Sequence, residues 1–305
     1  MPSLRRPHAI RKGSTIGIAA PAGPIDLERL EAGETMLRKL GFEVRRREDV
    51  AARRGYLAGD DARRAAEFME LVNDPEVDAI VCARGGYGSH RIVSMLDAEA
   101  VRRAAKPLVG YSDVTTLLLW QRRCAGLMGI HGPMLDRAAS LSAESRKSLV
   151  NSLLGMGPLP RIAGKSLAGG WSEGRLSGGS LSLVVASLGT PWEIDTRGAI
   201  LLLEEVGEDP YRVDRMLQQL MAAGKLSSAV GVGIGSMTGC ESERYPTPSV
   251  TEVLEEILAP LELPVVTELP FGHCDPHISW PVGARAAIDG DRAEIELLEA
   301  GVSKR

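Results

Sequence analysis

Ser112 stands where a serine could act as a nucleophile. It lies in Gly110-Tyr-Ser-Asp113, which follows a short apolar run and precedes the mostly apolar residues 114–119. This order predicts a buried parallel strand that turns sharply into a buried helix at Ser112. The first N–H groups of a helix are unpaired and carry partial positive charge, so they suit a developing oxyanion. The turn therefore matches a nucleophile elbow, although Val114 replaces the second glycine of Gly-x-Ser-x-Gly.

A simpler role for Ser112 fits the same residues, namely that it only caps the helix that follows. Serine is among the preferred N-cap residues because its hydroxyl accepts a hydrogen bond from an N–H of the first turn. On this stretch alone the cap is the more frequent explanation. A catalytic role for Ser112 requires that other residues of the chain supply a general base and an acid.

A glycine-rich turn, Arg84-Gly-Gly-Tyr-Gly88, follows the predicted strand 78–83. Its three glycines permit positive φ angles and let a ligand approach the backbone closely. A phosphate loop is not favoured, because neither Gly-Lys-Ser/Thr nor Gly-x-Gly-x-x-Gly is present. We expect this strand beside the Ser112 strand, so the turn could cradle an oxyanion or a substrate carboxylate. A plain tight turn is the alternative.

Two carboxylates, Glu204 and Glu205, end the predicted buried strand 199–204. Successive strand residues point to opposite faces, so at most one of the pair can face a given site. A carboxylate at a strand end can orient an imidazole, as the acid of a catalytic triad does. For Glu205 a solvated loop acid is the interpretation that we favour. The residues alone do not decide which glutamate faces a histidine.

Two histidines, His273 and His277, share a predicted loop with Cys274 and Asp275. A metal site is not favoured there, because metal ligands are usually held at defined spacings on regular elements. A base for Ser112 is a better use of one histidine, since loops commonly present catalytic groups. His131, at the end of a predicted strand, could equally be a structural histidine. The chain thus offers Ser…Glu…His in that order.

The elements that must position these residues alternate between strands and helices in the first half of the chain. This pattern predicts a parallel sheet covered on both faces. After a predicted helix at 142–154, a Gly- and Ser-rich stretch marks the boundary of a second, smaller mixed α/β domain. We expect an N-terminal α/β domain at 1–140, a linker at 141–175 and a C-terminal β/α domain at 176–305. Glu204 and His273 fall in the second domain, so the site would lie at the domain interface.

Composition excludes several classes of protein. The 305 residues have a formal net charge of −4 and only 4% aromatic residues, which argues against a nucleic-acid partner. The four cysteines are spread out without a Cys-x-x-Cys pair, as expected for reduced thiols in the cytoplasm. No run is long enough to span a membrane, and the N-terminal residues do not form a signal peptide. We expect a soluble cytoplasmic protein.

An ordered set of short motifs resembles the bacterial LD-carboxypeptidases (muramoyltetrapeptide carboxypeptidases) and the related microcin C immunity peptidases. The resemblance covers about residues 15–289, and the set is far more specific than any single motif. The motifs are Ala20-Pro-Ala-Gly23, Tyr56-Leu-Ala-Gly-Asp60, Arg84-Gly-Gly-Tyr-Gly88, Gly110-Tyr-Ser-Asp113, His131-Gly-Pro-Met134, Gly178-Gly-Ser-Leu181, Leu203-Glu-Glu205 with Pro210-Tyr-Arg212, and Gly272-His273 with Pro281-Val-Gly-Ala284. Ser180 stands where many relatives carry Asn or Cys, and Glu205 where Asp often follows.

The resemblance implies a serine peptidase whose triad is Ser112, His273 and Glu204. It implies an oxyanion hole formed by the backbone N–H groups of Gly86 and Asp113. The implied fold joins a parallel-sheet domain like that of the class I glutamine amidotransferases to a smaller swivelling β/α domain. Members are usually cytoplasmic homodimers that need no metal or other cofactor.

The implied reaction is hydrolysis of an amide between an L-centre and a terminal D-residue, releasing D-alanine from murein tetrapeptide during peptidoglycan recycling. The turn residues Arg84, Gly85 and Tyr87 are candidates for binding this small peptide. Two alternatives stay open. One is an immunity peptidase that cleaves aminoacyl-nucleotide antibiotics, and the other is a non-catalytic module that binds cell-wall peptides. The sequence decides neither the natural substrate, nor the residue that binds the substrate carboxylate, nor the dimer surface.

Overall fold

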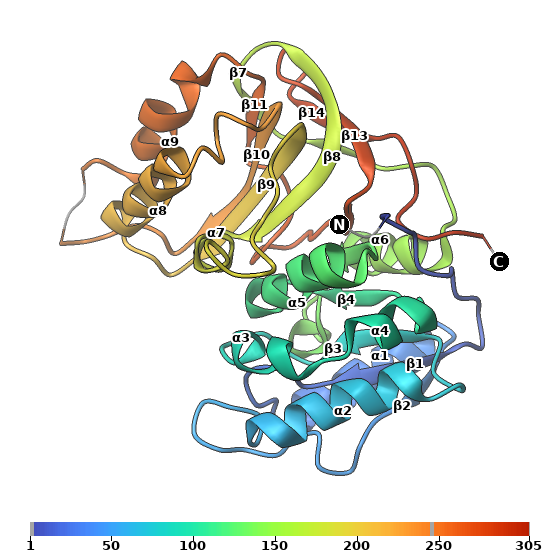
Figure 1. The fold of residues 1–305 in the computed structure, drawn as a ribbon. Coiled ribbons are helices and arrows are strands. Elements are labelled where there is room, and N and C mark those ends of the chain that lie inside the picture. Colours follow the sequence, from blue (N-terminus) through green and yellow to red (C-terminus); the bar gives the residue numbers. More distant parts are fainter. Residues whose placement is uncertain (1–2, 245–246, 305) are drawn as a thin grey trace. The chain divides into compact units, whose positions relative to one another are not determined.

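The computed structural model describes residues 3–244 and 247–304, which divide into two compact units (Figure 1). Among the described residues, the first unit holds 3–157, 279–282 and 300–304, and the second holds 158–278 and 283–299. Both units combine helices with a sheet that contains parallel strands, and the second is the smaller. The predicted α/β fold class with two units is therefore confirmed.

The first unit is built on a six-stranded sheet with the order β12-β5-β4-β3-β1-β2. Five strands are parallel: β1 (Thr15–Ala19), β2 (Glu43–Arg45), β3 (Ala79–Cys82), β4 (Leu108–Gly110) and β5 (Gly129–His131). The short apolar runs of the sequence predict these strands at 15–20, 42–45, 78–83, near 108 and at 127–131. The sixth, β12 (Trp280–Val282), pairs antiparallel with β5 and comes from the far end of the chain. Its place at this sheet edge was not predicted from the sequence.

The main helices of the first unit are α1 (Leu27–Lys39), α2 (Asp61–Asn73), α3 (Ser89–Ile92), α4 (Ala98–Ala104), α5 (Thr115–Trp120) and α6 (Ala143–Leu154). Short helical turns are η1 (Val93–Met95), η2 (Ser112–Val114), η3 (Gln121–Ala125) and η4 (Leu135–Arg137). Local capping explains where several helices begin and end. Asp60 accepts a hydrogen bond from the Arg63 N–H at the start of α2, and Gly155 ends α6 in the left-handed conformation.

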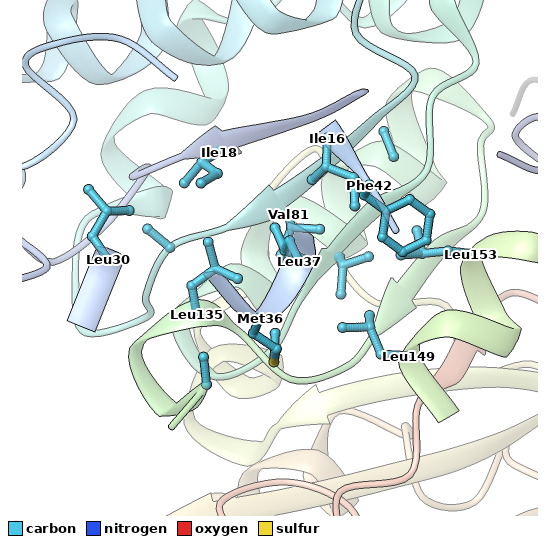
Figure 2. Packing of buried hydrophobic residues seen from close by; sticks show 14 of the residues in the cluster. Ile16, Ile18, Leu30, Met36, Leu37, Phe42, Val81, Leu135, Leu149 and Leu153 are labelled. Atoms are coloured by element: carbon cyan, nitrogen blue, oxygen red, sulfur yellow. The ribbon is translucent and has the colours of Figure 1, made fainter. Parts of the chain in front are cut away.

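A hydrophobic core lies between one face of this sheet and helices α1 and α6 (Figure 2). Alternate strand residues supply the sheet side of the core, as the twofold period of a strand requires. Figure 2 labels Ile16 and Ile18 of β1, Val81 of β3, Leu30, Met36 and Leu37 of α1, Leu149 and Leu153 of α6, and also Phe42 and Leu135. These side chains are between 0 and 7% exposed, so they fix the sheet against both helices.

The opposite face of the sheet is covered by α2 and α5. Gly17, between Ile16 and Ile18 on β1, shows how closely α2 approaches, because a Cβ at Gly17 would lie 2.8 Å from Leu71 Cδ2. A Cβ at Gly129 on β5 would likewise lie 2.5 Å from Leu118 Cδ2 of α5. Glycine at these positions lets the helices pack directly on the strands. Both faces are therefore buried, as parallel strands require.

The second unit is built on an eight-stranded mixed sheet with the order β6-β14-β13-β8-β9-β10-β11-β7. Its central strands are parallel: β8 (Trp171–Ser180), β9 (Ala199–Val206), β10 (Gly231–Thr238) and β11 (Val265–Thr267). Antiparallel strands flank them: β13 (Arg285–Asp289), β14 (Glu294–Leu297), β6 (Arg161–Ala163) and β7 (Lys165–Ala168). The turn Asp289-Gly290-Asp291 predicts a hairpin over 284–298, and β13 and β14 confirm it.

The helices of this unit are α7 (Leu181–Ala186), α8 (Pro210–Ala222) and α9 (Val250–Leu258), with a short turn η5 (Ala259–Leu261). Figure 1 shows α8 and α9 side by side, and they pack on each other. At the start of α9, Ser249 and Glu252 form a reciprocal capping box. The sequence pattern predicts helices over 210–221 and 249–258, and α8 and α9 confirm both.

Residues 141–175, which we expected to form a linker, contain much regular structure. They hold α6, β6, β7 and the first half of β8, and the division between the two units falls between Gly157 and Pro158. The Gly- and Ser-rich composition of β8 does not prevent pairing, because its neighbours β9 and β13 supply the hydrogen bonds along both edges. None of the helices in residues 3–244 and 247–304 is both long and apolar enough to cross a bilayer.

Candidate active site

Ser112 lies in a sharp turn between β4 and α5 at the carboxyl end of a parallel strand. It opens the short turn η2 and has a positive φ of 58°. This left-handed conformation costs a residue with a side chain of the order of 1–2 kcal/mol, so the surrounding structure has to hold it. Gly110 makes room for the turn, because a Cβ there would lie 2.5 Å from Val114 Cγ1. The predicted strand–turn–helix geometry is present.

Helix capping does not account for Ser112. Within the described residues, neither η2 nor α5 has a side-chain hydrogen bond at its start, and their N-cap positions are Tyr111 and Val114. The Ser112 side chain is partly exposed. The simpler alternative from the sequence, a serine that only caps the helix, is therefore wrong for this residue.

The glycine turn 84–88 lies directly beside Ser112, because β3 and β4 are parallel neighbours. A Cβ at Gly85 would lie 3.0 Å from Ser112 Cβ and 3.1 Å from Ser112 Oγ. Gly86 has a φ of 103° and packs on Gly23, whose N–H donates to the Gly85 carbonyl at 2.9 Å. Only glycine at position 85 leaves the space next to the Ser112 hydroxyl open.

Two backbone N–H groups near Ser112 are available as donors. Across residues 3–244 and 247–304, no protein acceptor hydrogen-bonds to the N–H of Gly86 or of Asp113. Such unpaired N–H groups are suited to stabilise an oxyanion. The Asp113 carboxylate accepts hydrogen bonds from the N–H groups of Gly88 at 3.3 Å and Ser89 at 2.8 Å. Burial raises the pKa of the Asp113 carboxyl, and these hydrogen bonds oppose that rise.

The other turn residues have distinct surroundings. Arg84 donates from Nη1 to the Pro24 carbonyl at 2.8 Å, so part of its guanidinium braces the neighbouring loop. Tyr87 is 49% exposed, and its ring forms a T-shaped pair with that of Tyr56, with centroids 5.6 Å apart. Tyr87 is therefore open to a ligand, whereas Arg84 has a structural contact already.

Glu204 and His273 form a hydrogen-bonded pair in the second unit. Glu204, on β9, is fully buried, and its Oε2 lies 2.7 Å from His273 Nδ1. The His273 backbone is held as well, since its carbonyl accepts from Thr238 Oγ1 at 3.1 Å. Gly272 has a φ of 100°, and a Cβ there would lie 2.7 Å from Glu204 Oε2. This glycine therefore lets the His273 loop lie directly on the acid.

Glu205 faces the opposite side of β9 and has a different role. Its Oε2 accepts from the Ser182 N–H at 2.7 Å at the start of α7, and its side chain is buried. Burial raises the pKa of Glu205, with the Val206 and Ser182 N–H groups opposing it. The interpretation of Glu205 as a solvated loop acid is wrong, because β9 runs through both carboxylates to Val206. The structure pairs His273 with Glu204 rather than Glu205.

The remaining histidines considered from the sequence are buried structural residues. His131 is fully buried and stacks on Trp280, with centroids 4.7 Å apart and planes at 14°. His277 is 1% exposed. In the described part of the chain, no group of three or more His, Cys, Asp or Glu side chains could hold a metal ion.

The two units thus carry complementary chemistry. The first presents a serine in a strained turn beside two available N–H donors, and the second presents an imidazole held by a buried carboxylate. A serine, a histidine with an acid behind it and a pair of backbone donors are the components of acyl-transfer catalysis.

Family comparisons agree with this chemistry. The LD-carboxypeptidase N-terminal domain matches residues 16–132, and the LD-carboxypeptidase C-terminal domain matches residues 173–288. The chain belongs to the LD-carboxypeptidase family, which confirms the resemblance inferred from the sequence motifs.

Individual relatives are similar over nearly the whole chain. A probable murein peptide carboxypeptidase from Bacillus subtilis is 38% identical and covers 98% of this chain and 96% of its own length. The crystal structure of muramoyltetrapeptide carboxypeptidase from Oxalobacter formigenes has a TM-score of 0.83 and 31% identity, covering 93% of this chain and 98% of that one. The microcin C7 self-immunity protein MccF of Escherichia coli is 28% identical, over 99% of this chain and 97% of its own.

Proposed function

We propose that this protein is a serine peptidase that hydrolyses an L,D amide bond and releases the terminal D-alanine of murein tetrapeptide, in peptidoglycan recycling. Membership of the LD-carboxypeptidase family and the murein peptide carboxypeptidases among its relatives support this substrate class. The observation that carries the proposal is the buried Glu204 bound to His273 Nδ1, because this arrangement is typical of a general base.

In the proposed mechanism Ser112, His273 and Glu204 form the triad. His273 takes the proton from Ser112 Oγ as that oxygen attacks the carbonyl carbon of the scissile amide. Glu204 fixes the imidazole tautomer and stabilises its charged form. His273 then protonates the leaving amine of D-alanine, and water attacks the resulting acyl-enzyme by the reverse proton movements. The reaction needs no cofactor.

The N–H groups of Gly86 and Asp113 are proposed as the oxyanion hole. Asp113 follows Ser112 in the chain, Gly86 follows Gly85 in the adjacent turn, and neither N–H has a protein acceptor among the described residues. Removal of one such donor typically reduces the rate by about 10²–10³-fold. Gly85 and Tyr87 are proposed to line the substrate position. Arg84 is the proposed partner of the substrate carboxylate, through the donors that Pro24 leaves available.

Hydrolysis of free murein tetrapeptide tests the proposed reaction. Purified protein is incubated with the tetrapeptide that ends in D-alanine and, as a matched control, with its epimer that ends in L-alanine. Mass spectrometry should show loss of one alanine from the first peptide only. Cleavage of both peptides to the same extent would contradict the proposed L,D specificity.

A second candidate substrate is an aminoacyl nucleotide, since the E. coli microcin C7 self-immunity protein is also a relative. A nucleobase would favour an aromatic platform, and Trp171 at the start of β8 is 59% exposed. Release of the aminoacyl group from an aminoacyl sulfamoyl adenosine, with no loss from the tetrapeptide, would favour this candidate. A third candidate function is that of a non-catalytic module that binds cell-wall peptides. Labelling of Ser112 by a fluorophosphonate would exclude this candidate.

We also infer, from the family resemblance, a cytoplasmic homodimer without nucleic-acid or membrane partners. The dispersed cysteines and the negative net charge of −4 support this inference. Light scattering of the purified protein should give twice the mass of the 32.6 kDa chain. A single-chain mass at micromolar concentration would contradict the dimer.

A further inference from the structure

We propose that Arg64 is a positioning residue for the oxyanion hole, acting through Gly88 on the Gly86 N–H. This inference rests on the proposed function, because it assigns a role within the same site. The Arg64 side chain donates to Pro21, Gly88 and Asp61, none of which belongs to the proposed triad. Its effect would pass through the backbone of the glycine turn.

Arg64 joins two loops at the carboxyl edge of the first sheet. The side chain leaves α2 and is fully buried. Its Nη1 donates to the Pro21 carbonyl at 2.6 Å and to the Gly88 carbonyl at 2.8 Å, while Nη2 donates to Asp61. One guanidinium therefore links the loop that follows β1 to the loop that follows β3.

Gly88 is held on its other side by Asp113. The Gly88 carbonyl accepts from Arg64, and its N–H donates to the Asp113 carboxylate, as does the N–H of Ser89. Asp113 also carries one of the two proposed oxyanion donors on its own backbone. The hydrogen bonds of Gly88 thus connect the glycine turn to the Ser112 turn.

The segment between Gly85 and Gly88 is held at both ends. At the first end the Gly85 carbonyl accepts from the Gly23 N–H. At the second end the Arg64 side chain, the Arg91 N–H and the Asp113 carboxylate hold Gly88. Gly86 lies between them and has no Cβ to restrict its backbone. Because its N–H has no protein acceptor to orient it, its direction depends on these two anchors. Oxyanion donors are effective only when they are oriented before the reaction.

The contact at Gly88 is too close for any other residue. Its φ is 139°, and a Cβ there would lie 2.4 Å from Arg64 Nη1 and 2.8 Å from Leu57 Cδ2. Burying a guanidinium costs free energy unless its donors are satisfied. Here two carbonyls accept from Nη1 and a carboxylate accepts from Nη2, in the planar fork geometry that only arginine offers. Nε is buried without a hydrogen-bond partner among the described residues. A lysine at position 64 would keep the charge but could not reproduce this fork.

The test compares Arg64→Lys and Arg64→Gln with Arg91→Gln as the matched control. Arg91 binds the same Asp61 carboxylate through Nε and Nη2. Its backbone N–H donates to the Gly88 carbonyl at 3.1 Å, and a glutamine at position 91 keeps that N–H. The control therefore removes a partner of Asp61 without touching the carbonyls of Pro21 and Gly88. Each variant is assayed for kcat and KM on murein tetrapeptide and for the rate of Ser112 labelling by a fluorophosphonate. Thermal unfolding identifies folded variants, and Arg64→Lys keeps the buried charge if Arg64→Gln does not fold.

We expect kcat and the labelling rate to fall together, by about 10-fold in Arg64→Lys and about 100-fold in Arg64→Gln, with KM within about threefold. Arg91→Gln should match the wild type. Folded Arg64 variants with the wild-type kcat and the wild-type labelling rate would overturn this inference but not the proposed function. A rise in KM with kcat unchanged would have the same consequence. A wild-type protein that is neither labelled nor active would overturn the proposed function, and this inference with it.

Discussion

At the scale of single residues, Glu204 and Glu205 show how one step along a strand changes the role of a carboxylate. Both are buried on β9, but Glu204 binds His273 and Glu205 binds the N–H of Ser182. The alternation of a strand separates them, and it could be predicted from the sequence. The sequence could not show which glutamate faces His273, because that depends on how the loop with Gly272 folds over β9.

Replacement of Glu204 by glutamine should reduce kcat by about 10³–10⁴-fold, because an amide neither stabilises the imidazolium nor fixes the right tautomer. Glu205→Gln is the matched control and should keep kcat/KM within about threefold of the wild type. Steady-state kinetics on murein tetrapeptide measure both variants. Equal losses in the two variants would contradict the assignment of Glu204 as the acid.

Ser112→Gly should be more stable than Ser112→Ala by about 1 kcal/mol, because the φ of 58° strains any residue that has a Cβ. The glycine variant also gains freedom in the unfolded state, which reduces the difference. Urea unfolding gives the free energy of each variant, and both should be inactive. An alanine variant as stable as the glycine variant would show that the turn is not strained.

The sequence predicted the sharp turn at Ser112 but not the buried charged residues near it. The order apolar strand, Gly110-Tyr-Ser-Asp113 and apolar helix was enough to predict the turn. Arg64 and Glu67 were missed because charged residues are usually exposed. A signal was present, since Arg64 precedes Phe68 by four residues and Leu71 by seven, and so lies on the buried face of α2.

At the scale of elements, α2 is tied to the loop after β1 by a buried carboxylate. Glu67 Oε2 accepts from the Ala20 N–H at 2.6 Å, and Oε1 lies 2.6 Å from Arg63 Nη2. Burial, opposed by Arg63 and the Ala20 N–H, raises the pKa of Glu67 from 4.5 to about 7. Between pH 4.5 and about pH 7, Glu67 is therefore mainly protonated in the folded state and mainly ionised in the unfolded state.

This shift predicts that Glu67 makes the protein less stable as the pH rises. The group has a higher pKa when folded, so its stabilising contribution is complete below about pH 4.5 and is lost as the pH passes through about 7. The free energy of unfolding of the wild type, relative to Glu67→Gln, should fall from about pH 5 to about pH 8. Urea titrations of both proteins at several pH values measure this difference in the free energy of unfolding. A difference that rises with pH would contradict the raised pKa.

The elements that the sequence predicted best have strong local signals, such as the caps Asp60, Ser142 and Ser249. The strands β6 and β7 were missed because they have only three and four residues and their partners β14 and β11 lie far along the chain. β8 was missed because it is rich in glycine, which has low strand propensity. β12 was missed because it has three residues, one of them Pro281. Its partner β5 lies about 150 residues earlier, and proline is acceptable there because β12 is an edge strand.

At the scale of the whole molecule, the first unit depends on distant parts of the chain. Trp280 of β12 is fully buried against His131, and Val302 is 3% exposed in the core. The Ser303 carbonyl also accepts from the Ala9 N–H at 2.9 Å. The chain therefore enters and leaves this unit several times, and both ends of the described chain contribute to it.

A fragment of residues 1–157 should consequently fail to fold cooperatively on its own, because β5 would be an uncovered apolar edge. Addition of the fragment 158–305 should restore a cooperative transition. Circular dichroism during thermal unfolding distinguishes the two cases, with the full chain as the control. If the isolated fragment unfolds cooperatively at the temperature of the full chain, β12 is not needed by the first unit.

The central claim is that Ser112 attacks the amide of a murein tetrapeptide with the help of His273 and Glu204. The most direct measurement incubates wild type and Ser112→Ala with the free tetrapeptide and follows the products by mass spectrometry. We predict loss of a single terminal alanine with the wild type and none with Ser112→Ala. Equal loss with both proteins would contradict the claim, because the reaction would then proceed without the serine hydroxyl.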